Sequence, residues 1–114
     1  MTTKEIMEIS PIVPVIALDD VQNAVPLALA LLEAGIHIME VTLRTEDGLK
    51  AIEKIAKIVP QMQVGAGTVV NKKDFRHALD AGASFVFSPG INQELIDYSI
   101  KKGVVFIPGV ATAS

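Results

Sequence analysis

The chain has 114 residues, of which 50% are hydrophobic and 4% aromatic, with a formal net charge of −3 and no cysteine. One domain is expected at this length, and the scattered Lys and Arg residues do not suggest a nucleic-acid partner. The lack of cysteine excludes disulfides, thiol catalysis and Cys-ligated metal, and it fits a cytoplasmic protein. A signal peptide is not predicted, because the first ten residues lack a basic start followed by an apolar run. A membrane span is not predicted either, because the apolar run at 24–32 is too short and contains a proline.

Five apolar runs, typical of β-strands, begin near residues 12, 37, 62, 84 and 104. Helical patterns separate them at residues 21–35, 46–59, 72–82 and 93–103. Residues with N-cap preference stand before these helices: Asp19 or Asp20, Thr45, Asn71 and Asn92. Three glycines follow helical patterns, as left-handed C-caps require: Gly35, Gly82 and Gly103. The second helix is expected to end at Pro60 instead.

This alternation predicts a parallel sheet, either open and doubly wound or part of a (β/α)8 barrel. The segment "HIMEVTLRT" at 37–45 favours the barrel. Its apolar face carries Met39, Val41 and Leu43, and its other face carries Glu40, Thr42 and Arg44. A barrel strand can present polar groups inward near its carboxyl end, whereas a covered open sheet favours two apolar faces. A full barrel needs eight strands, so residues 1–114 are predicted to form one α/β domain, the N-terminal half of a TIM barrel.

Glu40 and Arg44 are the first candidates for chemistry. An ionised carboxylate that faces a packed interior is costly unless it is paired or solvated. Glu40 is therefore either a catalytic or ligand-binding group, or one half of an internal ion pair with Arg44. The two residues lie about 13 Å apart along an extended strand, which makes direct pairing difficult. Arg44 either holds a carboxylate or phosphate with its planar fork or is an ordinary solvated arginine.

The segment "GAGTV" at 65–69 lacks the third glycine of a dinucleotide fingerprint, because Val70 stands in that place. We expect that glycine stands at positions 65 and 67 because its small size allows a helix to pack closely there. Thr68 falls at the carboxyl end of the third strand, a suitable place for a hydroxyl that contacts a ligand. The "SPG" and "PG" sequences at 88–90 and 108–109 could be ordinary turns. No metal site is predicted, since no His and carboxylate cluster has ligand spacing.

Five short motifs occur in order at the ends of successive strands: "VPVIAL" (13–18), "EVTLRT" (40–45), "VGAGTV" (64–69), "FSPG" (87–90) and "IPGV" (107–110). Each motif alone has little specificity. The ordered set, above all "EVTLRT" followed by "VGAGTV", resembles the 2-keto-3-deoxy-6-phosphogluconate (KDPG) aldolase family over essentially the whole chain.

The resemblance implies a class I aldolase on a (β/α)8 barrel, commonly a homotrimer, that needs no added cofactor. Such an enzyme splits KDPG, a keto-acid phosphate, into pyruvate and glyceraldehyde 3-phosphate, and many members also cleave 4-hydroxy-2-oxoglutarate. By motif position, Glu40 resembles the family's general acid/base. Arg44 and Thr68 resemble residues that hold the pyruvoyl carboxylate region, and Pro89 resembles a residue that lines the pocket.

The sequence departs from the family pattern in its lysines. The family's Schiff-base lysine lies on the sixth strand, and its phosphate-binding loops follow the seventh and eighth strands, all beyond Ser114. The eight lysines present are expected on outer helices or before the first strand: Lys4, Lys50, Lys54, Lys57, Lys72, Lys73, Lys101 and Lys102. We therefore expect these 114 residues alone to be inactive and, with two open sheet edges, not to form a stable monomer. A non-catalytic half-barrel that binds ligand or associates, or another phosphate-sugar barrel enzyme, remains an alternative.

Overall fold

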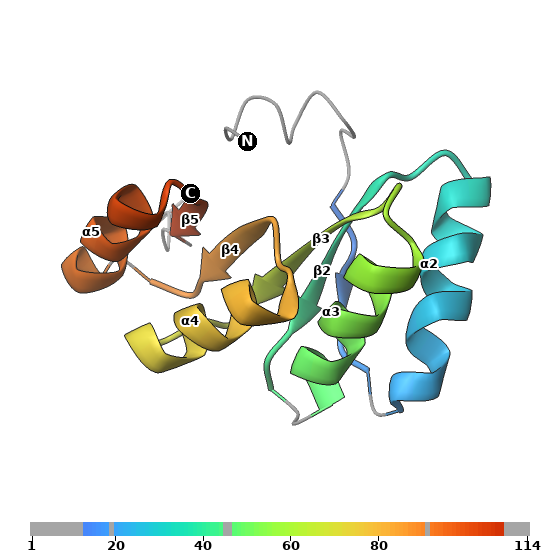
Figure 1. Ribbon diagram of the computed structural model, residues 1–114, viewed down its shortest axis with the longest axis horizontal. Helices are drawn as coiled ribbons and strands as arrows, with labels where there is room; N and C mark the ends of the chain where they lie inside the picture. Colours follow the sequence, from blue (N-terminus) through green and yellow to red (C-terminus); the bar gives the residue numbers. More distant parts are fainter. Residues whose placement is uncertain (1–12, 19, 45–46, 91, 109–114) are drawn as a thin grey trace, which may run out of the picture.

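The structure is a computed structural model that describes residues 13–18, 20–44, 47–90 and 92–108. Its strands are β1 (Val15–Ile16), β2 (Ile38–Thr42), β3 (Gln63–Gly67), β4 (Phe85–Ser88) and β5 (Val105–Pro108). Between them lie a 3₁₀ turn η1 (Val21–Asn23) and the helices α2 (Ala24–Glu33), α3 (Asp47–Ile58), α4 (Lys72–Ala81) and α5 (Gln93–Lys102) (Figure 1). The predicted order of elements is confirmed. The first helix differs in beginning with the 3₁₀ turn, and β1 is shorter than its apolar run.

The strand order identifies the architecture. Every strand pairs in parallel with the next strand along the chain, giving the order β1-β2-β3-β4-β5 with β1 and β5 outermost. A doubly wound sheet would instead reverse its strand order at a switch point. Figure 1 shows the helices following one another around the strands, as in one half of a (β/α)8 barrel. The predicted fold class is confirmed.

The two faces of the sheet have different neighbours. The larger apolar core lies between sheet and helices, and it includes Met39 and Val41 of β2 with Ile52 and Ile55 of α3. The opposite face carries a smaller cluster around Ile38 and Phe85, and its members among the described residues come from the strands and the segment before β1. This second face corresponds to the interior of the barrel.

Capping interactions fix the starts of the helices. Side-chain oxygens accept hydrogen bonds from backbone amides at three predicted N-caps: Asp20 to Gln22 (2.9 Å), Asn71 to Asp74 (2.8 Å) and Asn92 to Leu95 (3.3 Å). The predicted glycines have positive φ: Gly35 (84°), Gly82 (105°) and Gly103 (67°). Asp19 and Thr45 lie outside the described residues. Because each cap follows a strand, these bonds also set the path of the loops at the carboxyl ends of the strands.

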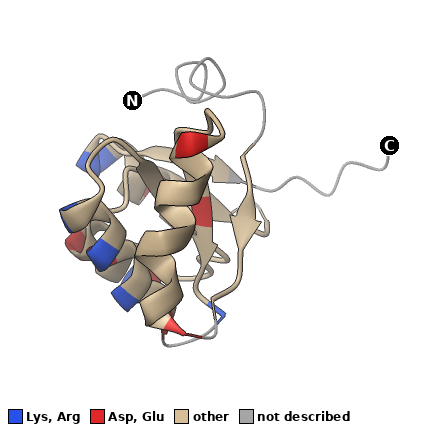
Figure 2. Ribbon diagram, turned by 90° about the vertical axis from the view of Figure 1, so that its right-hand side faces the viewer, with Lys and Arg blue, Asp and Glu red and all other residues tan. Residues whose placement is uncertain are grey.

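Charge is concentrated on the helices. Figure 2 shows most Lys and Arg residues on the helical side of the molecule, away from the strands. The described lysines all belong to α3, α4 and α5, as the sequence predicts. No helix in the described ranges has the length and apolar character needed to cross a bilayer.

Candidate active site at the carboxyl ends of the strands

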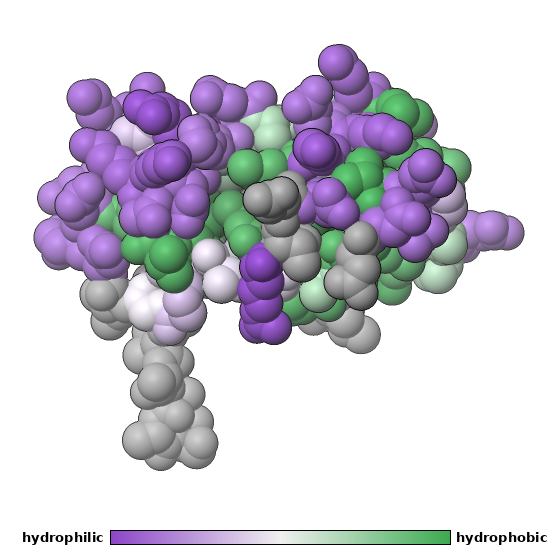
Figure 3. Space-filling model, turned by 90° about the horizontal axis from the view of Figure 1, so that it is seen from below, coloured by the Kyte–Doolittle hydropathy of each residue, from purple (hydrophilic) through white to green (hydrophobic). Residues whose placement is uncertain are grey.

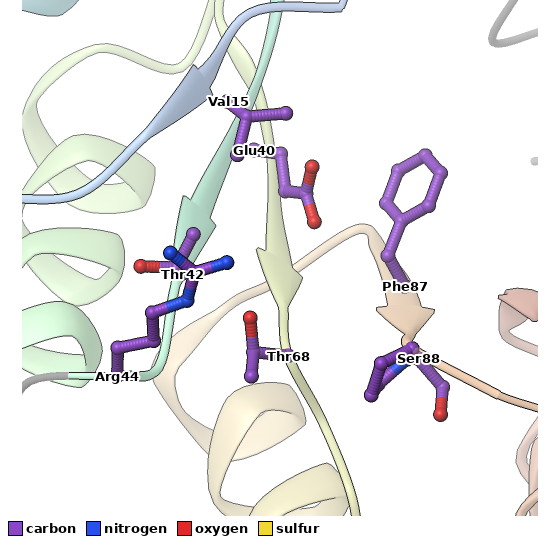
Figure 4. A pocket seen from close by; sticks show the side chains of 8 residues that line it. Val15, Glu40, Thr42, Arg44, Thr68, Phe87 and Ser88 are labelled. Carbon is purple, nitrogen blue, oxygen red and sulfur yellow. The ribbon is translucent and has the colours of Figure 1, made fainter. Parts of the chain in front are cut away.

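A cavity of about 210 Å³ opens at the carboxyl ends of β2, β3 and β4 (Figure 4). Its lining consists of Val15, Glu40, Thr42, Arg44, Thr68, Phe87, Ser88 and Pro89. The four residues singled out from the sequence, Glu40, Arg44, Thr68 and Pro89, therefore surround one space. Figure 3, which views the molecule from the end at which the strands finish, shows apolar side chains reaching the surface between hydrophilic margins. This is the end at which barrel enzymes carry their active sites.

Strand β2 places its polar side chains by simple alternation. Ile38 belongs to the inner cluster, whereas Met39 and Val41 belong to the core beneath the helices. Glu40 and Thr42 therefore face the barrel interior, where they are only 8% and 2% exposed. The prediction that these two side chains lie on the face opposite Met39 and Val41 is confirmed.

The glycines of β3 make room for this arrangement. A Cβ atom on Gly67 would lie 1.9 Å from Glu40 Oε1, and one on Gly65 would lie 2.1 Å from Cε2 of Phe85. The Glu40 carboxyl group therefore lies over the backbone of Gly67, and the Phe85 ring lies over Gly65. The prediction that both glycines serve helix packing is wrong. Both glycines face the barrel interior, where side chains of β2 and β4 occupy the space above them.

Glu40 is a buried acid without a direct partner. Its carboxyl group forms no hydrogen bond or ion pair with any described residue, although its backbone amide donates to the Pro14 carbonyl oxygen at 2.9 Å. The structure therefore does not contain the internal ion pair with Arg44. Burial raises the pKa of the Glu40 carboxyl above its ordinary value of 4.5, and the charge of the exposed Arg44 partly opposes this rise. A carboxyl group with a raised pKa that faces a cavity is suited to proton transfer.

The raised pKa predicts a pH-dependent gain in stability from Glu40→Gln in the natural gene product. The folded state binds the Glu40 proton more tightly than the unfolded chain, so this group destabilises the fold as pH rises from about 4.5 through the folded pKa. Glu40→Gln should therefore melt at a higher temperature than wild type at pH 7. The difference should shrink on acidification to pH 4, because the carboxyl is then mostly protonated in both states.

Melting curves between pH 4 and pH 8 measure this effect. Glu53→Gln, on the exposed surface of α3, is the control for losing one negative charge. A Glu40→Gln variant that is less stable than wild type at pH 7 would contradict the desolvation argument.

Thr68 and Ser88 complete the polar lining. Thr68 follows β3 with φ of 61°, a left-handed conformation that is unfavourable for a β-branched residue and marks functional sites in many proteins. Ser88 ends β4 and is 6% exposed. The sequence predicted that Thr42 faces inward but gave it no individual role, and it did not single out Ser88, Val15 or Phe87. The available signal was their position at or near the carboxyl ends of strands.

The arrangement suits acid/base chemistry on a small anionic molecule. One buried acid faces the cavity, one guanidinium lies at its mouth, and three hydroxyl-bearing side chains line it. Among the described residues, no lysine lines this cavity. His37 and His77 also lie outside the lining, and the described ranges contain no group of three metal-ligating side chains.

Comparison with known proteins identifies relatives in sequence and in structure. A family model described as KDPG and KHG aldolase matches residues 3–114. The chain is 44% identical over 114 residues to the 2-dehydro-3-deoxy-phosphogluconate aldolase of Pseudoalteromonas atlantica, and the match covers 100% of this chain and 53% of that protein.

Two solved structures superpose closely on the described fold. The 2-keto-3-deoxy-6-phospho-gluconate aldolase of Zymomonas mobilis ATCC 29191 gives a TM-score of 0.92 at 40% identity, covering 99% of this chain and 54% of that one. The KDPG aldolase of Legionella pneumophila, with pyruvate captured as a covalent carbinolamine intermediate, gives 0.89 at 42% identity, covering 94% and 52%. The chain thus spans about half the length of the relatives that it matches.

Proposed function

The chain belongs to the KDPG and KHG aldolase family. We propose that it contributes the general acid/base, Glu40, of a class I aldolase active site. The observation that carries this proposal is the buried Glu40 carboxyl, which lies over Gly67 and faces the cavity. We propose KDPG as the substrate, cleaved to pyruvate and glyceraldehyde 3-phosphate. 4-Hydroxy-2-oxoglutarate, cleaved to pyruvate and glyoxylate, is the second substrate.

The proposed reaction begins with a lysine amine, expected on the sixth strand of the family's barrel. This amine attacks the C2 ketone and, with loss of water, forms a cationic imine. Glu40, through a water molecule, removes the proton of the C4 hydroxyl, the C3–C4 bond breaks, and its electron pair moves into the imine to give an enamine. The aldehyde leaves, and Glu40 returns the proton to C3. Water then hydrolyses the imine and releases pyruvate.

Arg44 and Thr68 are proposed to hold the carboxylate of the keto acid. A guanidinium can bind a carboxylate through two parallel hydrogen bonds, and Arg44 stands at the cavity mouth. Thr68 contributes a hydroxyl from its left-handed position after β3, and Pro89 shapes the adjoining wall. By family resemblance we also propose a homotrimer located in the cytoplasm.

A coupled assay on the natural gene product tests the proposal. Pyruvate release is followed through lactate dehydrogenase, with KDPG and 4-hydroxy-2-oxoglutarate supplied separately. We expect release from at least one of them, and a pyruvate adduct on one lysine after borohydride reduction. Binding without release from either substrate would favour the non-catalytic alternative. Turnover of other phosphate sugars without an adduct would favour a different barrel enzyme.

A further inference from the structure

Thr42 carries an unpaired hydroxyl inside the site. Its Oγ1 atom is buried and has no hydrogen-bond partner among the described residues, and the side chain is 2% exposed. Ser99, another buried hydroxyl, instead donates to the Ile96 carbonyl oxygen at 2.6 Å. Buried hydroxyl groups in proteins nearly always have a partner. The unpaired oxygen of Thr42 therefore requires an explanation from its neighbours.

The Glu40 carboxyl shares the inward face of β2 with Thr42 and has suitable chemistry to pair with its hydroxyl. Its Oε1 atom lies 1.9 Å from the position of a Cβ atom on Gly67, and Gly67 is the register partner of Thr42 on the adjacent strand. Neighbouring strands lie about 4.8 Å apart, which places the carboxyl roughly one strand spacing from the Thr42 Cβ. Both side chains face the barrel interior. No hydrogen bond joins the two side chains in this structure, so their pairing requires one of them to change rotamer.

We infer that Thr42 is a positioning residue that hydrogen-bonds the Glu40 carboxyl during proton transfer, an inference that rests on the proposed function. A hydroxyl can donate to the carboxylate and can accept from the protonated acid. Thr42 can therefore hold Glu40 in both protonation states that the reaction needs. It acts through Glu40 and does not itself exchange a proton with substrate.

The cavity lining carries three hydroxyl groups, on Thr42, Thr68 and Ser88, and Thr42 is the one that shares a strand face with Glu40. Val15 pairs with Glu40 from β1, Gly67 lies beneath the carboxyl, and β4 contributes Phe87 and Ser88 to the cavity. Within the described lining, Arg44 is the one other charged group. Its positive charge lowers the pKa of Glu40 without a direct contact. A change at Thr42 should therefore be visible in the titration of Glu40.

Thr42→Val in the natural gene product tests the inference, since it replaces the hydroxyl by a methyl group of similar size. Loss of one donor to the carboxylate should lower kcat about 3- to 10-fold and leave KM within about twofold. The acidic limb of the pH profile should move upward by about half to one pH unit, because the charged form of Glu40 loses stabilisation. Thr42→Ser, which keeps the hydroxyl, should restore both values.

A matched control and a stability measurement separate this role from a structural one. Ser99→Ala removes a paired hydroxyl on α5 that is not part of the cavity lining, so it should lower the melting temperature without moving the pH profile. Thr42→Val should melt no lower than wild type. An unchanged pH profile, a melting loss like that of Ser99→Ala, or a defect confined to KM would overturn the inference. Absence of wild-type turnover would overturn the proposed function instead.

Discussion

Replacing Gly67 with alanine is expected to remove most of the turnover while leaving the protein nearly as stable as wild type. The new Cβ would lie 1.9 Å from Oε1, 2.6 Å from Cδ and 2.9 Å from Cγ of Glu40. All three atoms belong to one flexible side chain, which can rotate away at little cost to folding. The carboxyl then leaves its position over β3. Loss of a positioned general acid/base costs about 10²–10⁴-fold in rate.

Gly65→Ala is the matched control for this variant. It adds the same methyl group two residues earlier on the same face of β3, where the nearest atoms belong to the Phe85 ring at 2.1–2.4 Å. Phe85 is fully buried, so the ring cannot move aside freely and overpacking should cost about 1–3 kcal/mol of stability. Steady-state kinetics and thermal melts on both variants are the measurements. Wild-type kcat in Gly67→Ala would contradict the placement of Glu40 described above.

Glu40→Gln should reduce kcat for KDPG cleavage by about 10²–10⁴-fold, because the amide cannot accept or return the substrate proton. The change preserves the shape of the side chain, and the variant is expected to be more stable than wild type at pH 7. Loss of activity therefore cannot be ascribed to unfolding. Reduction with borohydride in the presence of pyruvate should still give a lysine adduct, since imine formation depends on the amine.

Steady-state assays of pyruvate release and intact mass after reduction measure the two effects separately. Glu53→Gln on α3 controls for the loss of a carboxylate. Turnover of Glu40→Gln within twofold of wild type would rule out the proposed acid/base role. Loss of the adduct together with turnover would show that Glu40 acts in binding or imine formation.

Alternation along β2 was enough to predict which of its side chains face inward, because a strand in a parallel barrel has one helix-covered face and one interior face. The caps at Asn71 and Asn92 were equally predictable, since each depends on a side chain and an amide three residues apart. The helix ends at Gly82 and Gly103 were predictable for the same reason, because each depends only on a local residue with positive φ.

The roles of Gly65 and Gly67 could not be read from the sequence. A glycine in the sequence indicates only that a side chain would not fit at that position. The side chain that occupies the space comes from another strand, so the sequence of β3 does not identify it. The same limit applies to the unpaired hydroxyl of Thr42, because its neighbours are set by the register of β2 with β3. The left-handed backbone of Thr68 was also not predictable. A left-handed conformation favours glycine or asparagine, so a threonine at this position gives no sign of it. The surrounding fold maintains the strain.

Exchange of the pyruvate methyl protons with solvent deuterium, followed by proton NMR, tests the central claim most directly. The experiment needs pyruvate alone, so it isolates proton transfer at C3 from aldehyde and phosphate binding. We predict that the wild-type natural gene product catalyses this exchange and that Glu40→Gln slows it by about 10²-fold or more. Exchange in Glu40→Gln at the wild-type rate would contradict the claim that the carboxyl over Gly67 is the acid/base of the site.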